Sequence, residues 1–439
     1  MPFRGALCCF LAIAVAPLLP QIDQPPGAGK SLAGRWLVTA DMHGTPVHIS
    51  MDIAQQGEKI SGTYDRQRLQ GSIKGASLHF VAQDDSGEEI GDGTLLDGVL
   101  SGTIVDYDEA NKEHPDRYTF TATLVPERLP VVPRRHEFAP SIFYREFSAL
   151  HTPVLTVSPG DTIHTSTVDA SGADETGQRR SLGGNPQTGP IYVESATPGD
   201  TLVVHLTRLR LNRDYALSDD AIVARGLDSG LAVKMQDGGK TVRWHLDLSK
   251  GLASLEKPGE HTAQYTIPVH PMLGCLATAP APARAAPNTG DSGSFGGNMD
   301  FNELVEGATI HLPVFVPGAL LYVGDGHAVQ GDGELNGNAL ETSLDVEFTV
   351  NVIPRRRTPA PRVESDTHIM AMGLGGSLDD AFRNATSNMA QWLIEDYKLT
   401  PREVAEVLGP AAEYKVSEVA DRNAGIVLKI RKDLLKRIQ

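Results

Sequence analysis

Cysteine is scarce in this sequence. The 439 residues contain three cysteines: Cys8, Cys9 and Cys275. Cys8 and Cys9 lie in an N-terminal stretch with the character of a signal peptide, so the exported chain would retain Cys275 alone. A single cysteine excludes an intramolecular disulfide. An exported protein without disulfides is more typical of a bacterial periplasm than of a disulfide-stapled animal secretory domain.

Basic residues are also in short supply. Lys and Arg number 39 against 55 Asp and Glu, which gives a formal net charge of -16. Such a surface repels phosphate backbones, so we expect no nucleic-acid partner. Beyond the N-terminus, no apolar segment is long enough to span a bilayer, so we also expect no membrane span.

The first twenty residues are expected to form a signal peptide. Arg4 supplies a positive charge, residues 6–19 form a short apolar stretch, and Ala14-Val15-Ala16 offers a small-x-small cleavage pattern. Pro17 follows directly, which leaves the cleavage site open. The sequence therefore predicts a secreted or periplasmic bacterial protein.

The composition favours a mainly β protein. Gly and Pro, with 44 and 29 residues, favour short strands and turns over long helices. Residues 47–53 alternate apolar and polar side chains, and Ile60-Ser61-Gly62-Thr63 is repeated as Leu100-Ser101-Gly102-Thr103. We therefore expect an accessory all-β domain over residues 32–126, folded as a small barrel or sandwich.

The remaining chain is predicted to hold a Pro-rich linker over residues 127–140 and a main domain over residues 141–439. Strand patterns dominate the first part of the main domain, and helices come late. Ser377 is a plausible N-cap, and Thr400 begins a capping box followed by Pro at the first helical position. With a final strand over residues 426–430, these patterns predict an α+β C-terminal portion.

Acidic residues cluster on Gly-rich loops that follow the apolar residues 319–323. Asp325, His327, Asp332 and Glu334 lie within ten residues, and Asp300 and Glu341 flank them. Carboxylates with one imidazole suit a divalent metal, or the general base and acid for attack of water on a carbonyl. Asp-Gly pairs are also ordinary turn chemistry, and composition alone favours turns over a site.

Several motifs resemble the acetamidase/formamidase family, in order from about residue 138 to residue 435. The most specific is Gly324-Asp325-Gly326-His327-Ala328-Val329-Gln330-Gly331-Asp332-Gly333-Glu334. The others are Asn185-Pro186-Gln187-Thr188-Gly189-Pro190-Ile191, Pro198-Gly199-Asp200, His270-Pro271-Met272-Leu273-Gly274, Gly296-Gly297-Asn298-Met299-Asp300 and the stretch from Ala412 to Asp421. The resemblance implies a β-sandwich with an added α/β portion, usually assembled as an oligomer.

The resemblance also implies an activity and a set of site residues. The family hydrolyses small linear amides, such as formamide and acetamide, to the carboxylic acid and ammonia. Carried over to this chain, it implies a divalent metal, zinc or alternatively calcium, that activates water. The expected metal ligands are Asp169, Asp300, Asp325 and His327. The expected catalytic residues are Asp332, Glu334 and Glu341, with Glu334 or Glu341 as general base. The expected substrate-binding residues are Asn185, Thr188, Ser292 and Asn298.

The chain departs from the family at a few positions. Phe295 stands where the family commonly has His, Thr278 where Gly is more frequent, and residues 288–294 differ from the usual loop. The β-domain at 32–126 is additional. These departures leave a second hypothesis open: a non-catalytic periplasmic binding protein on the same scaffold, whose N-terminal domain recognises a partner or a carbohydrate.

Overall fold

A computed structural model describes residues 31–108, 113–126, 132–235, 238–282 and 285–438. The predicted signal peptide, residues 1–20, lies outside the described residues. Among the helices that are described, none combines the length and hydropathy needed to cross a bilayer.

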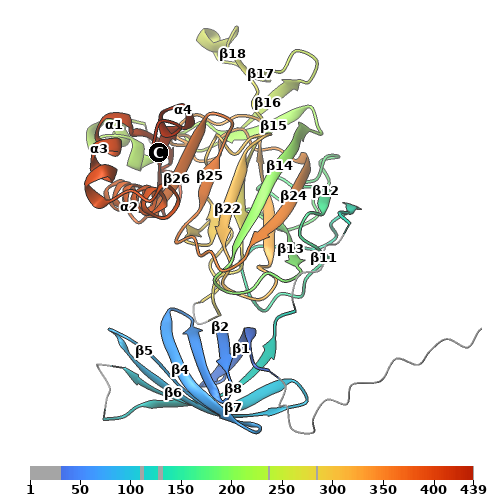
Figure 1. The fold of residues 1–439 in the computed structure, drawn as a ribbon. Coiled ribbons are helices and arrows are strands. Elements are labelled where there is room, and N and C mark those ends of the chain that lie inside the picture. Colours follow the sequence, from blue (N-terminus) through green and yellow to red (C-terminus); the bar gives the residue numbers. More distant parts are fainter. Residues whose placement is uncertain (1–30, 109–112, 127–131, 236–237, 283–284, 439) are drawn as a thin grey trace, which may run out of the picture.

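The N-terminal domain is an eight-stranded closed barrel (Figure 1). Of the two architectures expected from the sequence, a barrel or a sandwich, the structure has the barrel. Each strand pairs antiparallel with the next, and the last pairs with the first. The strands are β1 (Gly34–Met42), β2 (Thr45–Gln56), β3 (Lys59–Tyr64), β4 (Gln67–Lys74), β5 (Ser77–Asp84), β6 (Gly87–Leu96), β7 (Val99–Asp108) and β8 (Asp116–Leu124).

Two glycines explain the repeated four-residue theme of the barrel sequence. A Cβ on Gly62 would lie 1.8 Å from the backbone oxygen of Asp52, and one on Gly102 would lie 2.0 Å from that of Asp92. Only glycine permits backbones to approach this closely, so both positions let neighbouring strands coil tightly around the barrel. Inward side chains such as Val38 and Phe80 are fully buried and fill the interior.

The main domain is a sandwich of two sheets. The larger sheet contains β9 (Arg135–Glu137), β12 (Thr162–Ser166), β14 (Thr201–Leu211), β22 (Thr309–Pro313), β24 (Leu344–Ile353), β25 (Arg362–Glu364), β26 (His368–Gly375), β27 (Glu413–Glu418) and β28 (Ala424–Arg431). Its order is β27-β28-β26-β25-β22-β14-β24-β12-β9.

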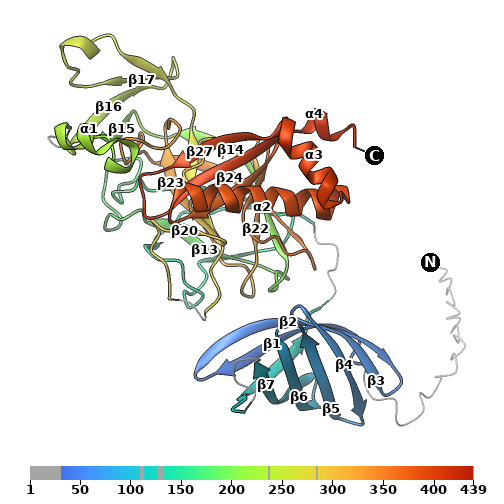
Figure 2. The same cartoon turned by 90° about the vertical axis from the view of Figure 1, so that its left-hand side faces the viewer.

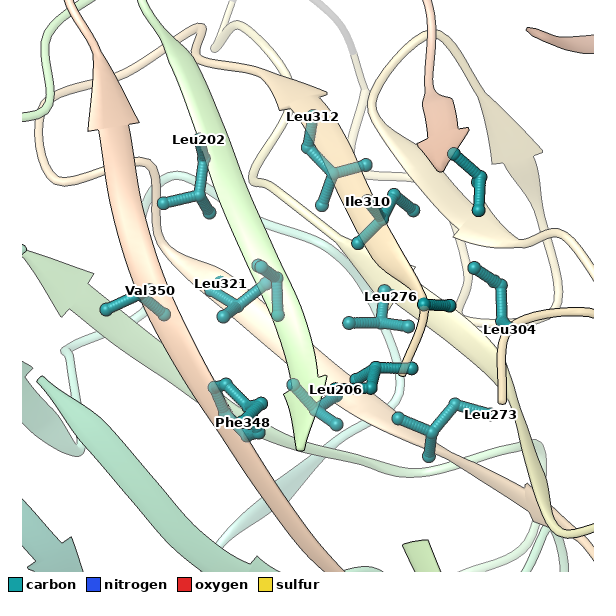
Figure 3. Close-up of a cluster of buried hydrophobic side chains, with 14 of the residues drawn as sticks. Leu202, Leu206, Leu273, Leu276, Leu304, Ile310, Leu312, Leu321, Phe348 and Val350 are labelled. Carbon is teal, nitrogen blue, oxygen red and sulfur yellow. The ribbon is translucent and has the colours of Figure 1, made fainter. Parts of the chain in front are cut away.

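The second sheet contains β10 (Phe143–Tyr144), β11 (Leu155–Val157), β13 (Gln187–Val193), β19 (Met272–Ala277), β20 (Ser292–Gly293), β21 (Gly296–Asn298) and β23 (Leu321–His327). Six of these strands run in the order β10-β13-β23-β19-β21-β20, and β11 pairs with β13. Leucines of β14 and β22 face Leu276 and Leu321 of the second sheet across the core (Figure 3). This interlayer core holds β19 and β23 rigidly, and both strands lead into the candidate site.

A four-stranded sheet projects from the main domain at the end opposite the barrel (Figures 1 and 2). It contains β15 (Tyr215–Asp219), β16 (Thr241–Asp247), β17 (Leu252–Leu255) and β18 (Thr266–Pro268). Three short helices lie within the same stretch of chain: η1 (Ala224–Gly226), α1 (Ser229–Lys234) and η2 (Glu260–Thr262).

The C-terminal portion is α+β, as predicted. Its helices are α2 (Leu378–Tyr397), α3 (Pro401–Ala411) and α4 (Lys432–Leu435). The Ser377 hydroxyl caps α2, and Thr400 and Glu403 form the expected capping box at α3. The buried face of α2 carries Met389 and Trp392 and packs on β26 and β28.

Part of the predicted linker belongs to the sandwich. β9 lies within residues 127–140 and pairs in parallel with β12 at the edge of the larger sheet. Arg135 bonds Glu347 at 2.6 Å and His136 bonds Asp161 at 2.7 Å. The extended backbone expected of a Pro-rich segment is therefore used here for edge pairing, anchored by charged side chains.

Ion pairs join the barrel to the main domain. Arg35 of β1 bonds Asp200, whose carboxylate also accepts the backbone N–H of Thr197 and Arg355. Asp52 of β2 pairs with Arg355 at 2.7 Å. The side chains of Arg35 and Asp200 are only 11% and 1% exposed, so this pair is the buried centre of the contact.

Replacement of Arg35 by alanine tests this contact. Because it leaves the buried Asp200 carboxylate without its cation, we expect Arg35→Ala to lower the free energy of unfolding by about 2–4 kcal/mol. Arg357→Ala is the matched control: its pair with Asp65 is exposed, so a loss of ~0–1 kcal/mol is expected. Urea denaturation measures both, and equal losses would contradict the assignment.

Candidate active site

The candidate site begins where β23 ends. Asp325 and His327 are two residues apart on this fully buried strand, so their side chains lie on one face of the sheet. The glycines around them make room. A Cβ on Gly274 of β19 would lie 2.2 Å from Asp325 Oδ2 and 2.4 Å from Asp300 Oδ1. The absence of a side chain at Gly274 thus leaves the space that the carboxylates of Asp300 and Asp325 occupy.

Four carboxylates surround His327. Its Nε2 lies 3.3 Å from Asp325 Oδ1 and 3.2 Å from Glu341 Oε1. Potential ligand atoms of Asp300, His327 and Glu334 lie within 4.8 Å of one another, and so do those of Asp325, His327 and Glu341. All five residues are less than 10% exposed. The structure therefore brings together three of the four predicted metal ligands and two of the three predicted catalytic residues.

The buried charges are poorly balanced. Burial raises the pKa of Asp300 and Glu334 well above their usual values, with neighbouring carboxylates adding to the effect for Asp300. Burial likewise raises the pKa of Glu341 to about 7. Burial lowers the pKa of His327, but Glu341 and Asp325 outweigh this and hold it well above its usual value. Perturbations of this size are typical of functional sites.

Several polar atoms of the cluster have no hydrogen-bond partner within the described part of the chain. They are His327 Nε2, Asp300 Oδ1 and Glu341 Oε2. Burying such atoms without a partner costs free energy. A cation placed among them would pair with the nitrogen and with both oxygens. One imidazole with carboxylates is a donor set that suits a divalent transition metal. The residues present therefore fit a metal ion.

Gln330 decides which nitrogen of His327 is available. Gln330 Nε2 donates to the backbone oxygens of Asp300, at 2.6 Å, and Ser417, at 3.1 Å. Its Oε1 therefore faces His327 Nδ1, 2.9 Å away, and accepts from it. With Nδ1 bonded to Gln330, Nε2 is the nitrogen that faces the carboxylates and can serve as a metal ligand once its proton is released.

A chain of side-chain amides supports the acids. Gln187 donates to Asn185, Asn185 donates to Asn298, and Asn298 donates to both Asp300 and Asp421. Both N–H groups of Asn298 are thus used on carboxylates. Asn185 and Asn298, expected to bind substrate, line the same cavity as the acids and also hold them in place.

The cavity above the cluster has a volume of about 740 Å³. Its inner end carries Asn298, Asp325, Glu334, Glu341 and Asp421, and its outer wall is formed by residues 143–146, His151, Asn288 and Gly290. Asp421 was not among the predicted site residues, although it ends the C-terminal stretch that resembles the family. Burial raises its pKa to about 6. The outer wall carries no motif, so sequence reasoning had no signal for it.

Four expected site residues lie elsewhere. Asp169 is buried in an ion pair with Arg213 at 2.7 Å, which occupies the carboxylate, and it belongs to neither group around His327. Asp332 is exposed and bonds Asn302 and Lys415. Within the described residues, Asp332, Thr188 and Ser292 do not line the cavity. The Thr188 hydroxyl donates to the Ser166 backbone, and the Ser292 hydroxyl is buried.

Comparisons with known proteins point in one direction. Residues 282–370 match the profile of the Acetamidase/Formamidase family. The chain is 27% identical over 222 residues to an acetamidase of Mycolicibacterium smegmatis, covering 38% of this chain and 53% of that protein. It is 27% identical over 218 residues to a formamidase of Methylophilus methylotrophus, covering 38% and 51%. The chain thus spans about half the length of these curated relatives.

Solved structures resemble a larger share of the chain. A predicted acetamidase/formamidase from Thermoanaerobacter tengcongensis has a TM-score of 0.59 and 28% identity, covering 70% of this chain and 98% of that one. An acetamidase from Bacillus halodurans has a TM-score of 0.58 and 27% identity, covering 69% and 99%. Nearly all of each structure is matched by part of this chain, which agrees with an additional domain here.

Substitution of Gln330 tests the orientation of His327. Methionine has a similar shape but cannot accept the Nδ1 proton in the same way, so we expect Gln330→Met to weaken zinc binding by about 10- to 100-fold. Gln330→Glu keeps an acceptor and should bind zinc more tightly than the methionine variant. Affinity is measured by competition with a chelating dye. Equal affinity in Gln330→Met and wild type would contradict the assignment.

The buried acids predict the pH dependence of stability. Burial, with Asp421 nearby, raises the pKa of Glu418 to about 8, and that of Asp421 is about 6. The folded metal-free protein therefore holds protons that the unfolded chain has released between about pH 4 and pH 8. Its free energy of unfolding should fall as the pH rises through this window. Denaturation at pH 5 and pH 8 measures the change, and Glu418→Gln should flatten it; stability that rises with pH in both proteins would refute this.

Proposed function

Because the chain belongs to the acetamidase/formamidase family, we propose that it hydrolyses the carbon–nitrogen bond of a linear amide to a carboxylic acid and ammonia. The observation that carries the proposal is the cluster of four buried carboxylates around His327, three of which line the inner end of a cavity. Formamide and acetamide are the simplest substrates of this class, as the names of the similar formamidase and acetamidase indicate.

The proposed cofactor is one divalent ion, zinc in preference to calcium. His327 Nε2, Asp325 and Glu341 are the proposed ligands, because the two carboxylate oxygens lie 3.3 and 3.2 Å from the same nitrogen. An imidazole ligand favours zinc, whereas calcium takes six to eight oxygens. When bound, such an ion lowers the pKa of a water molecule and polarises the carbonyl oxygen of the substrate.

Glu334 is the proposed general base. Glu334 and Glu341, the other candidate, both line the cavity, but the Glu341 carboxylate lies 3.2 Å from His327 Nε2 and is already proposed as a metal ligand. The raised pKa of Glu334 suits a group that takes a proton from water and returns it to the departing nitrogen. In this scheme the carbon–oxygen bond forms, the carbon–nitrogen bond breaks, and ammonia leaves.

Asp421 and Asn298 are proposed to orient the substrate. Asn298 holds Asp421 at the cavity surface, where its carboxylate can accept a hydrogen bond from the substrate NH₂ group. Asn185 donates a hydrogen bond to Asn298 and so fixes its side chain. Preorganised polar groups of this kind position a reacting bond without further rearrangement.

Export to the periplasm and assembly as a homo-oligomer are further proposals. Export rests on the signal-like residues 1–20, and fractionation of cells that express the full chain tests it. Assembly is supported by exposed apolar side chains on the projecting sheet and its loops, such as Leu248 and Tyr265, which are 52% and 50% exposed. Light scattering of the purified protein measures the subunit number.

Replacement of His327 tests the proposed function most simply. His327→Ala removes the nitrogen ligand, so we expect a loss of bound metal and a fall of about a hundredfold or more in amide turnover. Ammonia release from an amide panel and metal analysis of the same sample are the measurements. Asp332→Asn is the control, because its exposed carboxylate lies outside the cavity, and it should keep both properties. A metal-free, fully active His327→Ala protein would rule the proposal out.

A further inference from the structure

The cavity is much larger than the smallest amides require. Its volume of about 740 Å³ falls in the range of roughly 300–1,000 Å³ that is typical of sites for drug-sized ligands. Asp325, Glu334 and Glu341 line the inner end, next to the buried His327. A substrate such as acetamide would leave the outer part of the cavity without a ligand group to contact.

The outer wall presents a stacked pair of rings. Tyr144 and His151 lie with their ring centroids 3.7 Å apart and their planes 19° from parallel, and both line the cavity. Tyr144 is on β10, which pairs with β13, so it belongs to the same sheet that carries Asp325 and His327 on β23. The wall is therefore fixed relative to the inner end.

A series of ring contacts connects this wall to the core. The ring centroids of His151 and Tyr322 are 6.2 Å apart. Those of Tyr322 and Phe147 are 5.4 Å apart, as are those of Phe147 and Phe295. Phe295 is the position at which the family commonly has His. That departure thus places a fifth ring behind the wall and makes its support more apolar.

The nitrogens of the His151 ring have polar neighbours. Tyr322 Oη donates to the Ser148 backbone at 2.9 Å and lies 2.9 Å from His151 Nδ1. His151 Nε2 lies 3.2 Å from Glu146 Oε1. These contacts hold the His151 ring in place. At this part of the wall a ligand therefore meets the rings of Tyr144 and His151 rather than free imidazole nitrogens.

We propose that the substrate is a primary amide with an aromatic ring on its acyl side, and that this ring packs against Tyr144 and His151. The inference rests on the proposed amide hydrolysis. Since the leaving group is ammonia, any further bulk of the substrate has to be on the acyl side. Hydrolysis then converts an aryl-substituted amide and water to the aryl-substituted carboxylic acid and ammonia. Contacts remote from the reacting bond raise turnover by fixing its position.

The test compares phenylacetamide with acetamide by ammonia release. Wild type should have a kcat/KM for phenylacetamide at least about tenfold above that for acetamide. Tyr144→Ala should lower the ratio of the phenylacetamide value to the acetamide value about 3- to 10-fold, the size expected for loss of one aromatic pair. Tyr144→Phe keeps the ring and should restore it. The matched control is Tyr414→Ala, which removes a stacked ring of the surface pair with Phe382 outside the cavity.

Other outcomes separate this inference from the proposed function. Efficient hydrolysis of acetamide with no preference for phenylacetamide would overturn the inference and leave amide hydrolysis intact. Turnover of neither amide would overturn the proposed function, and calorimetric binding of phenylacetate then decides the inference alone. Binding that is no tighter than that of acetate would overturn it. If Tyr144→Ala fails to fold, binding of phenylacetate and of acetate to the wild-type protein replaces the kinetic comparison.

Discussion

The site depends on an imbalance of buried charge. Asp300, Asp325, Glu334 and Glu341 converge on a single imidazole, and all are shielded from water. Folding therefore brings like charges together in a medium that solvates them poorly, which is unfavourable unless protons or a cation neutralise them. In the metal-free protein the raised pKa values of the acids show how protons meet part of this demand. A divalent cation meets it as well, with His327 Nε2 as one of its ligands.

Three parts of the chain, far apart in sequence, supply this arrangement. β23 provides Asp325 and His327, the Gly-Gly-Asn-Met-Asp segment provides Asn298 and Asp300, and the turn after β27 provides Asp421. Gln330 ties two of them together, since its amide bonds the backbone at Asp300 and at Ser417 of β27. The C-terminal α+β portion is thus part of the site rather than a separate lobe.

Sequence reasoning located the inner end of the site but not its outer wall. Periodicity, capping residues and Gly-rich loops predicted the β-rich architecture, the capped helices and the acids on either side of His327. Asp169 and Asp332 are acids in suggestive positions, but long-range pairing with Arg213 and Lys415 determines their role, and no local pattern reports such partners. The stacked rings of Tyr144 and His151 depend on strand pairing and tertiary contacts, so they left no signal in the sequence.

The central claim is that the acid cluster is built to hold one divalent ion. Calorimetric titration of the metal-free wild-type protein with zinc, near pH 6.5 in two buffers of different ionisation enthalpy, tests it most directly. Because Asp300, Glu334 and Glu341 hold protons without a metal, the account predicts binding of one ion per chain with release of protons to the buffer. Absence of binding, or binding without proton release, would contradict it.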